Sequence, residues 1–169
     1  LKRAGQGSAI TLEKQDNLLN IHIEDRINRK FSLSLIEIDN EEIDFNAKTS
    51  KMEFSSKIEI NSMDLIASVE DCAVVAESCS FQVENRRFII EAKGLNSARS
   101  EFSGDEAMID GENSKAKYSL EYMQKFLKGA KMCEKTMIQF AEDHPLKIDF
   151  RVPNMELSFV LAPRVETED

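Results

Sequence analysis

The feature that most constrains the fold of this chain is a repeated order of secondary structure. From Lys57 to Ala92 the residue patterns predict strand, helix, strand and strand, and the same order returns from Lys117 to Leu161. In the second stretch we expect a helix at Ser119–Lys131 and strands at Thr136–Ala141, Leu146–Arg151 and Glu156–Leu161. A repeat too short to bury its own apolar face must pack against neighbours, so this pattern favours assembly over a private catalytic cleft.

Alternating apolar and polar residues predict antiparallel strands through the rest of the chain. Apolar residues at helical spacing predict one further helix, which begins after Asn61 or Ser62 and runs to Ala76. Helices that lie on one side of antiparallel sheets make an α+β fold. The strands expected outside the second repeat are Ile10–Glu13, Leu18–Glu24, Arg29–Ile36, Ser56–Asn61, Ser80–Glu84, Arg87–Lys93, Ala98–Ser103 and Ala107–Asp110.

An acidic segment, residues 37–46, lies between the first three strands and the remainder of the chain. It contains neither Gly nor Pro, and its apolar residues stand singly among charges. This composition indicates an extended connector that lies on a surface rather than a loose linker.

The overall charge limits how the chain can contact nucleic acid. The 169 residues carry a formal net charge of −9, which argues against coating nucleic acid by bulk attraction. It leaves open a protein that holds DNA by geometry and keeps its few basic groups on one face. No apolar run reaches bilayer-spanning length. The odd number of cysteines, three, favours buried free thiols over a disulfide framework or a zinc site.

No catalytic constellation is present in the sequence. The phosphate-loop, dinucleotide, zinc-protease and paired-cysteine motifs are all missing. His22 lies in an alternating strand and His144 precedes a proline, and neither has a partner at ligand spacing. We therefore expect no enzyme activity, no cofactor and no metal, although scattered carboxylates leave a paired-carboxylate site open.

Several sequence runs resemble a known family when they are taken in order. They are Tyr118-Ser119-Leu120-Glu121-Tyr122, Phe126-Leu127-Lys128-Gly129-Ala130-Lys131, His144-Pro145-Leu146-Lys147-Ile148 and Leu161-Ala162-Pro163-Arg164-Val165-Glu166. Their order and spacing resemble the DNA sliding clamp of archaea and eukaryotes, the proliferating cell nuclear antigen family. The resemblance covers essentially the whole chain and implies that roughly the first third of the family's length precedes it.

The resemblance implies a domain organisation. Residues 1–35 correspond to the second half of the N-terminal clamp domain, 36–50 to the interdomain connector and 51–169 to the C-terminal clamp domain. The implied fold places antiparallel sheets outside and helices on the inner face of a trimeric ring.

The resemblance also implies a function. Such a ring surrounds double-stranded DNA without sequence preference. It serves replication and DNA repair as a DNA polymerase processivity factor. The ring is a homotrimer or a heterotrimer. It is intracellular, in the cytoplasm of archaea or in the nucleus of eukaryotes. The implied partners are DNA polymerase, clamp loader, flap endonuclease and ligase, which would bind through peptide motifs. No membrane association is implied.

Two other functions stay open. One is a clamp homologue that regulates or sequesters partners without encircling DNA. The other is a DNA-repair enzyme with a cryptic site.

Three sets of site residues follow from the resemblance, residue by residue. The partner-peptide set is Ile43, Phe45, Pro145, Val160, Ala162 and Pro163. The DNA-facing set is Lys2, Arg3, Lys125, Lys128 and Lys131. The subunit-interface set is Arg29, Phe31, Leu33 and Leu35 of one subunit with Ala98, Ser100 and Phe102 of the next. Taken singly, Val160 and Ala162 could equally be core residues of the last strand, and the lysines could equally be ordinary solvated surface residues.

One helix departs from the family pattern. Between Lys57 and Arg86 the sequence contains no Lys or Arg, whereas the family offers basic groups to DNA from this helix. Ala67, Glu70 and Val74 take those places, so the helix is expected to repel phosphate or to stay neutral.

Overall fold

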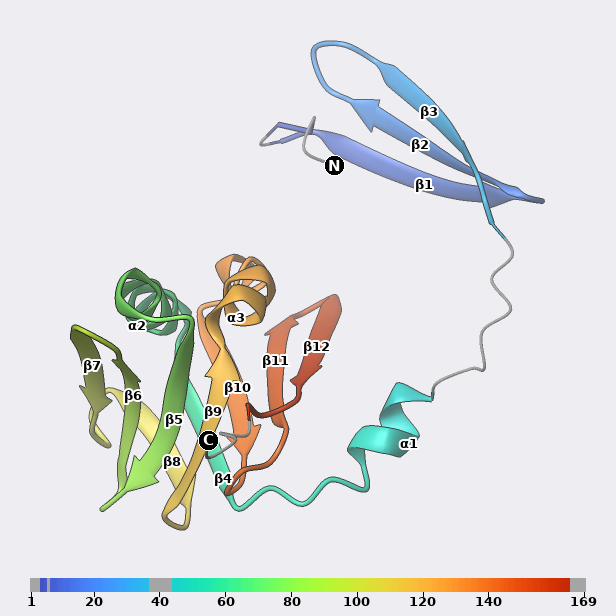
Figure 1. Ribbon diagram of the computed structural model, residues 1–169. Coiled ribbons are helices and arrows are strands. Elements are labelled where there is room, and N and C mark those ends of the chain that lie inside the picture. Colours follow the sequence, from blue (N-terminus) through green and yellow to red (C-terminus); the bar gives the residue numbers. More distant parts are fainter. Residues whose placement is uncertain (1–3, 6, 37–43, 165–169) are drawn as a thin grey trace. The chain divides into compact units, whose positions relative to one another are not determined.

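The computed structural model describes residues 4–5, 7–36 and 44–164 and divides the chain into two units, residues 1–50 and 51–169. The first unit is an antiparallel meander of β1 (Ala9–Gln15), β2 (Leu18–Glu24) and β3 (Arg29–Ser34), followed by the short helix α1 (Phe45–Thr49) (Figure 1). Asp16 supports the β1–β2 turn with a positive φ of 48°, a conformation that Asp tolerates better than most residues.

The register of the meander separates its two faces. Ile10 pairs with Ile23, Leu12 with Ile21, and Ile21 with Phe31, so apolar side chains share one face. Thr11, His22 and Lys30 share the other. This alternation is what the sequence predicted for the three strands.

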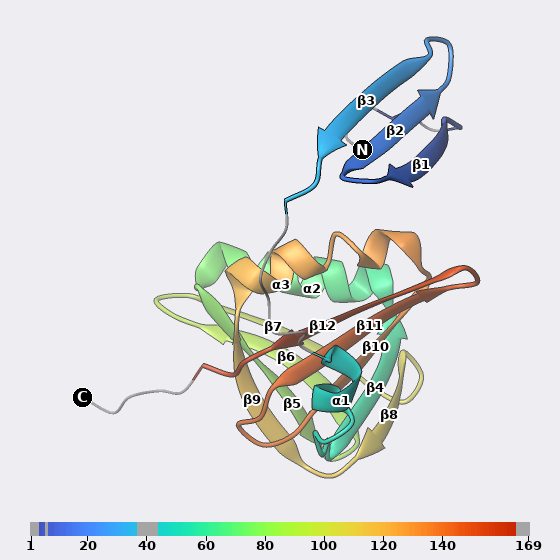
Figure 2. The ribbon, with the colours of Figure 1, turned by 90° about the vertical axis from the view of Figure 1, so that its right-hand side faces the viewer.

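The second unit contains two antiparallel sheets with the strand orders β12-β11-β10-β4-β8 and β7-β6-β5-β9. Its strands are β4 (Ser56–Asn61), β5 (Ser78–Glu84), β6 (Arg87–Lys93), β7 (Ser97–Phe102), β8 (Ala107–Gly111), β9 (Ser114–Ser119), β10 (Lys135–Phe140), β11 (Leu146–Val152) and β12 (Met155–Leu161). Its helices are α2 (Ser62–Val75), α3 (Leu120–Phe126) and the short 3₁₀ helix η1 (Ala130–Met132). Figures 1 and 2 show α2 and α3 side by side across one side of the two sheets.

The two repeats exchange their first strands. β4 opens the first repeat but pairs with β10 of the second, and β9 opens the second repeat but pairs with β5 of the first. Each sheet therefore takes a strand from both repeats. Neither repeat can complete a sheet alone, which explains why the pattern occurs twice in one unit.

The core lies between the sheets and under the helices. Phe81 of one sheet meets Phe140 of the other at a ring-centroid distance of 6.4 Å, and Leu65 and Val69 of α2 are fully buried. Burying each such side chain contributes roughly 1.5–3 kcal/mol before conformational entropy is counted. The fold therefore depends on the apolar stripes that the sequence patterns identified.

Of the two residues that the sequence offered as the cap of α2, Asn61 and Ser62, the structure uses Asn61. The Asn61 side chain accepts hydrogen bonds from the backbone N–H groups of Met63 (2.8 Å) and Asp64 (3.4 Å). Such a cap contributes about 1 kcal/mol to stability. Ser119 occupies the same position before α3 but makes no capping bond with its side chain.

Two expected segments differ from the structure. The expected helix Ser119–Lys131 stops at Phe126, because tight bonds from Gly129 N to Phe126 O and from Ala130 N to Leu127 O close a turn before η1. A β-carbon on Gly129 would come within 2.8 Å of Phe150, so only glycine lets this turn approach the sheet. The expected extended connector ends in α1, where Asp44 Oδ1 accepts from Ala47 N; residues 37–43 lie outside the described residues.

Candidate functional site

Within the described ranges, the structure brings together no catalytic or metal-binding cluster. No group of three or more His, Cys, Asp or Glu residues there could hold a metal ion. The His144 carbonyl accepts a hydrogen bond from the Tyr118 hydroxyl (2.8 Å), and its ring packs edge-on against Phe54 at 6.3 Å. His144 therefore has a structural role in this unit.

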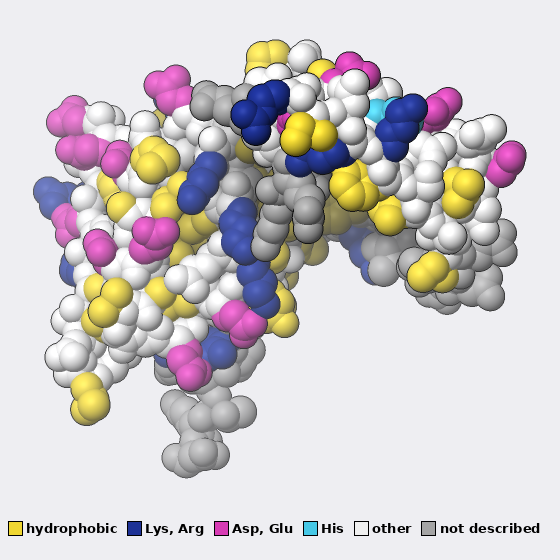
Figure 3. Space-filling view, turned by 90° about the horizontal axis from the view of Figure 1, so that it is seen from above, with side chains coloured by type: hydrophobic (Ala, Val, Ile, Leu, Met, Phe, Trp, Pro, Cys, Tyr) yellow, Lys and Arg dark blue, Asp and Glu magenta, His cyan; other side chains and the backbone are white. Residues whose placement is uncertain are grey.

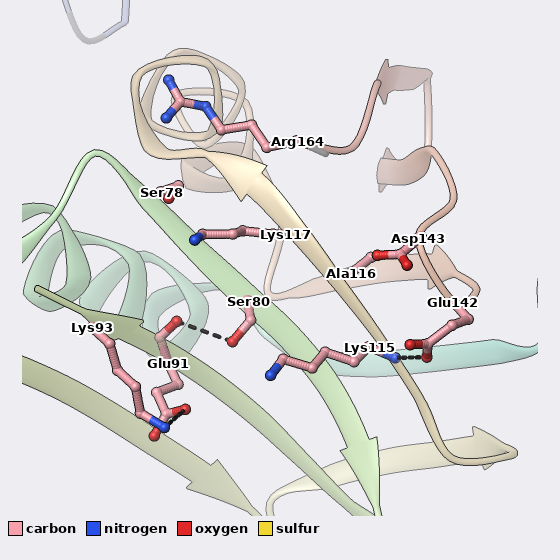
Figure 4. Close-up of a pocket in the computed structure, with 10 residues that line it drawn as sticks. All are labelled: Ser78, Ser80, Glu91, Lys93, Lys115, Ala116, Lys117, Glu142, Asp143 and Arg164. Carbon is pink, nitrogen blue, oxygen red and sulfur yellow. Dashed lines mark hydrogen bonds and ion pairs between the residues drawn. The ribbon is translucent and has the colours of Figure 1, made fainter. Parts of the chain in front are cut away.

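A polar groove of about 490 Å³ lies on the outer face of the β6-β5-β9 sheet (Figure 4). Lys93 Nζ lies 2.9 Å from the Glu91 carboxylate, and the Ser80 hydroxyl donates to the Glu91 carbonyl. The bond from Lys93 lowers the pKa of Glu91. A lowered pKa makes the Glu91 carboxylate a weaker base, so this ion pair does not give the groove an activated base.

The helical side of the second unit carries the three lysines of the expected DNA-facing set. Lys125, Lys128 and Lys131 are all exposed along α3 and η1. Figure 3 looks down on these helices and shows a row of Lys and Arg side chains, with Asp and Glu side chains gathered toward α2. Lys125 Nζ lies 2.7 Å from Glu121 Oε1 and 5.1 Å from the Tyr122 ring centroid. Lys2 and Arg3 lie outside the described residues.

The neighbouring helix α2 presents a different surface. Ala67 and Glu70 are exposed, and Val74 is 85% exposed. A small groove of about 150 Å³ between α2 and the α3–η1 segment is lined by Ile66, Glu70, Gln124, Leu127, Lys128 and Lys131. One carboxylate thus shares a groove with two of the lysines.

The expected partner-peptide residues of the second unit lie at one end of β11 and β12. Leu146 pairs with Leu161, so the register places Pro145 across from Ala162. Val160 and Pro163 are half-buried, and Ala162 is exposed. Phe45 lies in α1 of the first unit, where it is 38% exposed, and Ile43 lies outside the described residues.

One feature beside this surface was missed from the sequence. Lys147 is the register partner of Val160, and its Nζ lies 3.0 Å from the buried Asp149 carboxylate. The Ser158 hydroxyl donates to the same carboxylate (2.6 Å). The alternation of β11 could have shown it, because Lys147 and Asp149 must share the face opposite Leu146 and Ile148.

The expected subunit-interface residues lie on two edge strands. β3 ends the three-stranded sheet and β7 ends the four-stranded sheet. Phe31 and Leu33 are exposed, and Leu35 lies just past β3, where its N–H donates to Asn17 O. Arg29, Ala98 and Ser100 are half-buried, whereas Phe102 stacks on Phe88 in the core and can offer only its backbone.

The opposite edge of the four-stranded sheet is closed by the chain itself. Lys115 N donates to the Glu142 carboxylate (2.6 Å), and Lys115 O accepts from Asp143 N (3.0 Å). Lys117 O accepts from Arg164 N (2.7 Å). β9 therefore has its edge groups largely satisfied within the chain.

Comparison with known proteins identifies the family. Residues 48–165 match the family model described as the proliferating cell nuclear antigen, C-terminal domain. The DNA polymerase sliding clamp of Methanothermobacter thermautotrophicus is 31% identical over 172 residues, which are 100% of this chain and 68% of that protein. That of Methanococcus maripaludis is 26% identical over 174 residues, 98% of this chain and 68% of that protein.

Solved structures agree on the fold. The proliferating cell nuclear antigen of Thermococcus kodakaraensis superposes with a TM-score of 0.83 at 22% identity, covering 96% of this chain and 68% of that one. The proliferating cell nuclear antigen of Entamoeba histolytica superposes with a TM-score of 0.82 at 18% identity, covering 97% of this chain and 67% of that one. The expected α+β clamp fold and the resemblance are confirmed: this chain belongs to the proliferating cell nuclear antigen family.

Proposed function

We propose that this chain is a subunit of a sliding clamp that encircles duplex DNA and tethers DNA polymerase as a processivity factor. The observation that carries the proposal is a relative 31% identical over the full chain that is named a DNA polymerase sliding clamp. The proposed domains are 1–35 as part of an N-terminal clamp domain, 36–50 as the connector and 51–169 as the C-terminal clamp domain, in keeping with the two compact units.

The open strand edges support a ring. An unpaired edge exposes a row of N–H and C=O groups, and pairing with another chain satisfies them. β3 and β7 are edge strands in separate sheets, whereas β9 is closed by Glu142, Asp143 and Arg164. Pairing of β3 of one subunit with β7 of the next would join subunits head to tail, and such a contact closes into a ring when the rotation permits.

The charge distribution suits a protein that holds DNA by topology. A net charge of −9 opposes tight phosphate binding, whereas a closed ring stays on DNA without it. Three exposed lysines on the α3–η1 side supply modest attraction that is screened over about 8–10 Å at physiological salt. The protein would have no catalytic activity of its own.

Partner enzymes would dock at the end of β11 and β12. The proposed docking surface comprises Pro145, Val160, Ala162 and Pro163 at that end of the hairpin, and Ile43 and Phe45 of the connector complete the set. Such a surface suits a short helical turn with hydrophobic anchors. DNA polymerase, clamp loader, flap endonuclease and ligase are the proposed partners.

Substitution at this surface tests the docking proposal. Pro163→Glu would place a charge among the anchors, and we expect a loss of about 2 kcal/mol or more, roughly 30-fold in affinity for a polymerase-tail peptide. Pro153→Glu is the matched control, since Pro153 is exposed in the turn at the far end of the same hairpin. Equal affinity for the wild type and Pro163→Glu would refute the docking surface.

Primer extension tests the function itself. With a polymerase and a clamp loader from the same source, the full-length protein should lengthen the products made in a single binding event. Products of unchanged length, at clamp concentrations that saturate the polymerase, would contradict the proposal.

A second candidate is a clamp homologue that binds partners without encircling DNA. It is favoured by α2, which carries Glu70 and no Lys or Arg. The native mass distinguishes the two functions: a trimer supports the ring, and a persistent monomer supports the regulator.

A further inference from the structure

We propose that Glu70 weakens the grip of this subunit on DNA by opposing phosphate contact at Lys128 and Lys131. The inference rests on the proposed function, because it assumes that the α2–α3 side faces the duplex. It goes beyond that function by assigning opposite electrostatic roles to the two neighbouring helices.

The exposed side of α2 offers phosphate nothing to bind. Met63, Ala67, Glu70 and Val74 recur at helical spacing and therefore share one side of the helix. Met63 is 62% and Val74 85% exposed, so this side is solvent-facing. Glu70 is the charged residue of this row, and Asp64 and Asp71 are exposed elsewhere on α2. Like charge repels the DNA backbone.

The α3–η1 side offers phosphate two lysines besides Lys125. Lys125 is held by Glu121 at 2.7 Å, an ion pair that raises the pKa of Lys125 and lowers that of Glu121. In the part of the chain that the structure describes, Lys128 and Lys131 form no ion pair. Phosphate contact should therefore fall mainly on these two side chains.

Glu70 is placed to act on both of them. It lines the same small groove as Lys128 and Lys131, but forms no ion pair with either among the described residues. The lysines consequently stay available to DNA, while the nearby carboxylate lowers the local positive potential. A weak grip is what sliding requires, since each firm phosphate contact must break before the ring can move.

Charge-neutral variants of the full chain test the assignment. Binding to a short fluorescent duplex is measured by anisotropy over a range of salt concentrations. Glu70→Gln should tighten binding by about twofold to fivefold, the range that an exposed charge interaction allows. Asp71→Asn is the matched control, because it removes the same charge from the next residue of α2, which does not line the groove. Its effect should be less than half as large.

Lysine variants separate this inference from the proposed function. Lys128→Gln and Lys131→Gln should each weaken binding and reduce the slope of log affinity against log salt by about 0.9. If both lysine variants bind like the wild type, these residues do not face DNA and the proposed function loses its support here. If they weaken binding while Glu70→Gln equals the wild type or Asp71→Asn, the role of Glu70 alone is overturned.

Discussion

At the scale of single residues, Asn61 is the clearest local determinant of α2. Replacing it with Ala removes two hydrogen bonds that its side chain accepts from backbone N–H groups. We expect a loss of about 1 kcal/mol, or roughly 2–4 °C in Tm for a chain of this size. Ser119→Ala is the comparison, because Ser119 holds the equivalent position without a capping bond. Thermal unfolding that shows equal losses for both variants would contradict the capping role of Asn61.

The cysteines give a second prediction at this scale. Burial raises the pKa of Cys72 to about 11, with Asp71 and Glu91 adding to the shift, and burial also raises the pKa of Cys79. Because the thiolate is the reactive form, both thiols should resist alkylation at pH 8 in the native protein. Cys133 is only half-buried and should react first. Mass spectrometry of the labelled protein gives the order, and early labelling of Cys79 would contradict the packing.

Individual site residues could be predicted from the sequence only in part. The motif Leu161-Ala162-Pro163-Arg164 identified the end of β12, and the register then places Pro145 across from Ala162. The ion pair between Lys147 and Asp149 was missed, although the alternation of β11 places both side chains on one face. The burial of Asp149 was not predictable, because it depends on β11 lying between β10 and β12. Glu70 was recognised as unusual, but its groove with Lys128 and Lys131 depends on helix packing.

At the scale of elements, periodic segments were predicted well and irregular ones were not. The expected strands Leu18–Glu24, Ser56–Asn61 and Arg87–Lys93 agree with β2, β4 and β6 residue for residue. The early end of α3 was missed, because the contact of Gly129 with Phe150 is long-range and leaves no local signal. The exchange of first strands between repeats was likewise invisible in the pattern.

The two strand edges give the element-scale prediction. If β3 and β7 join neighbouring subunits, their backbone amides should exchange hydrogen more slowly at protein concentrations where the assembly forms. β9 serves as the internal control, since the chain already closes its edge. Exchange in β7 that is independent of concentration, although assembly occurs, would show that another surface makes the interface.

At the scale of the whole molecule, the sequence predicted the family and the fold. The motifs between Tyr118 and Glu166 carried the resemblance, and the family model, the relatives and the solved structures agree with it. In the described ranges, every helix is too short or too polar to cross a membrane. The placement of the two units depends on contacts that local patterns do not encode, so the site that Phe45 would share with Val160 stays a prediction.

Retention on circular DNA tests the central claim most directly. The full-length protein is loaded onto a nicked circular plasmid and washed at high salt, and the plasmid is then cut once. Because a ring is held by topology rather than by phosphate affinity, we expect it to stay on the circle and to leave the linear product. If the protein leaves the circular DNA as fast as the linear DNA, or is retained equally on both, encirclement is contradicted.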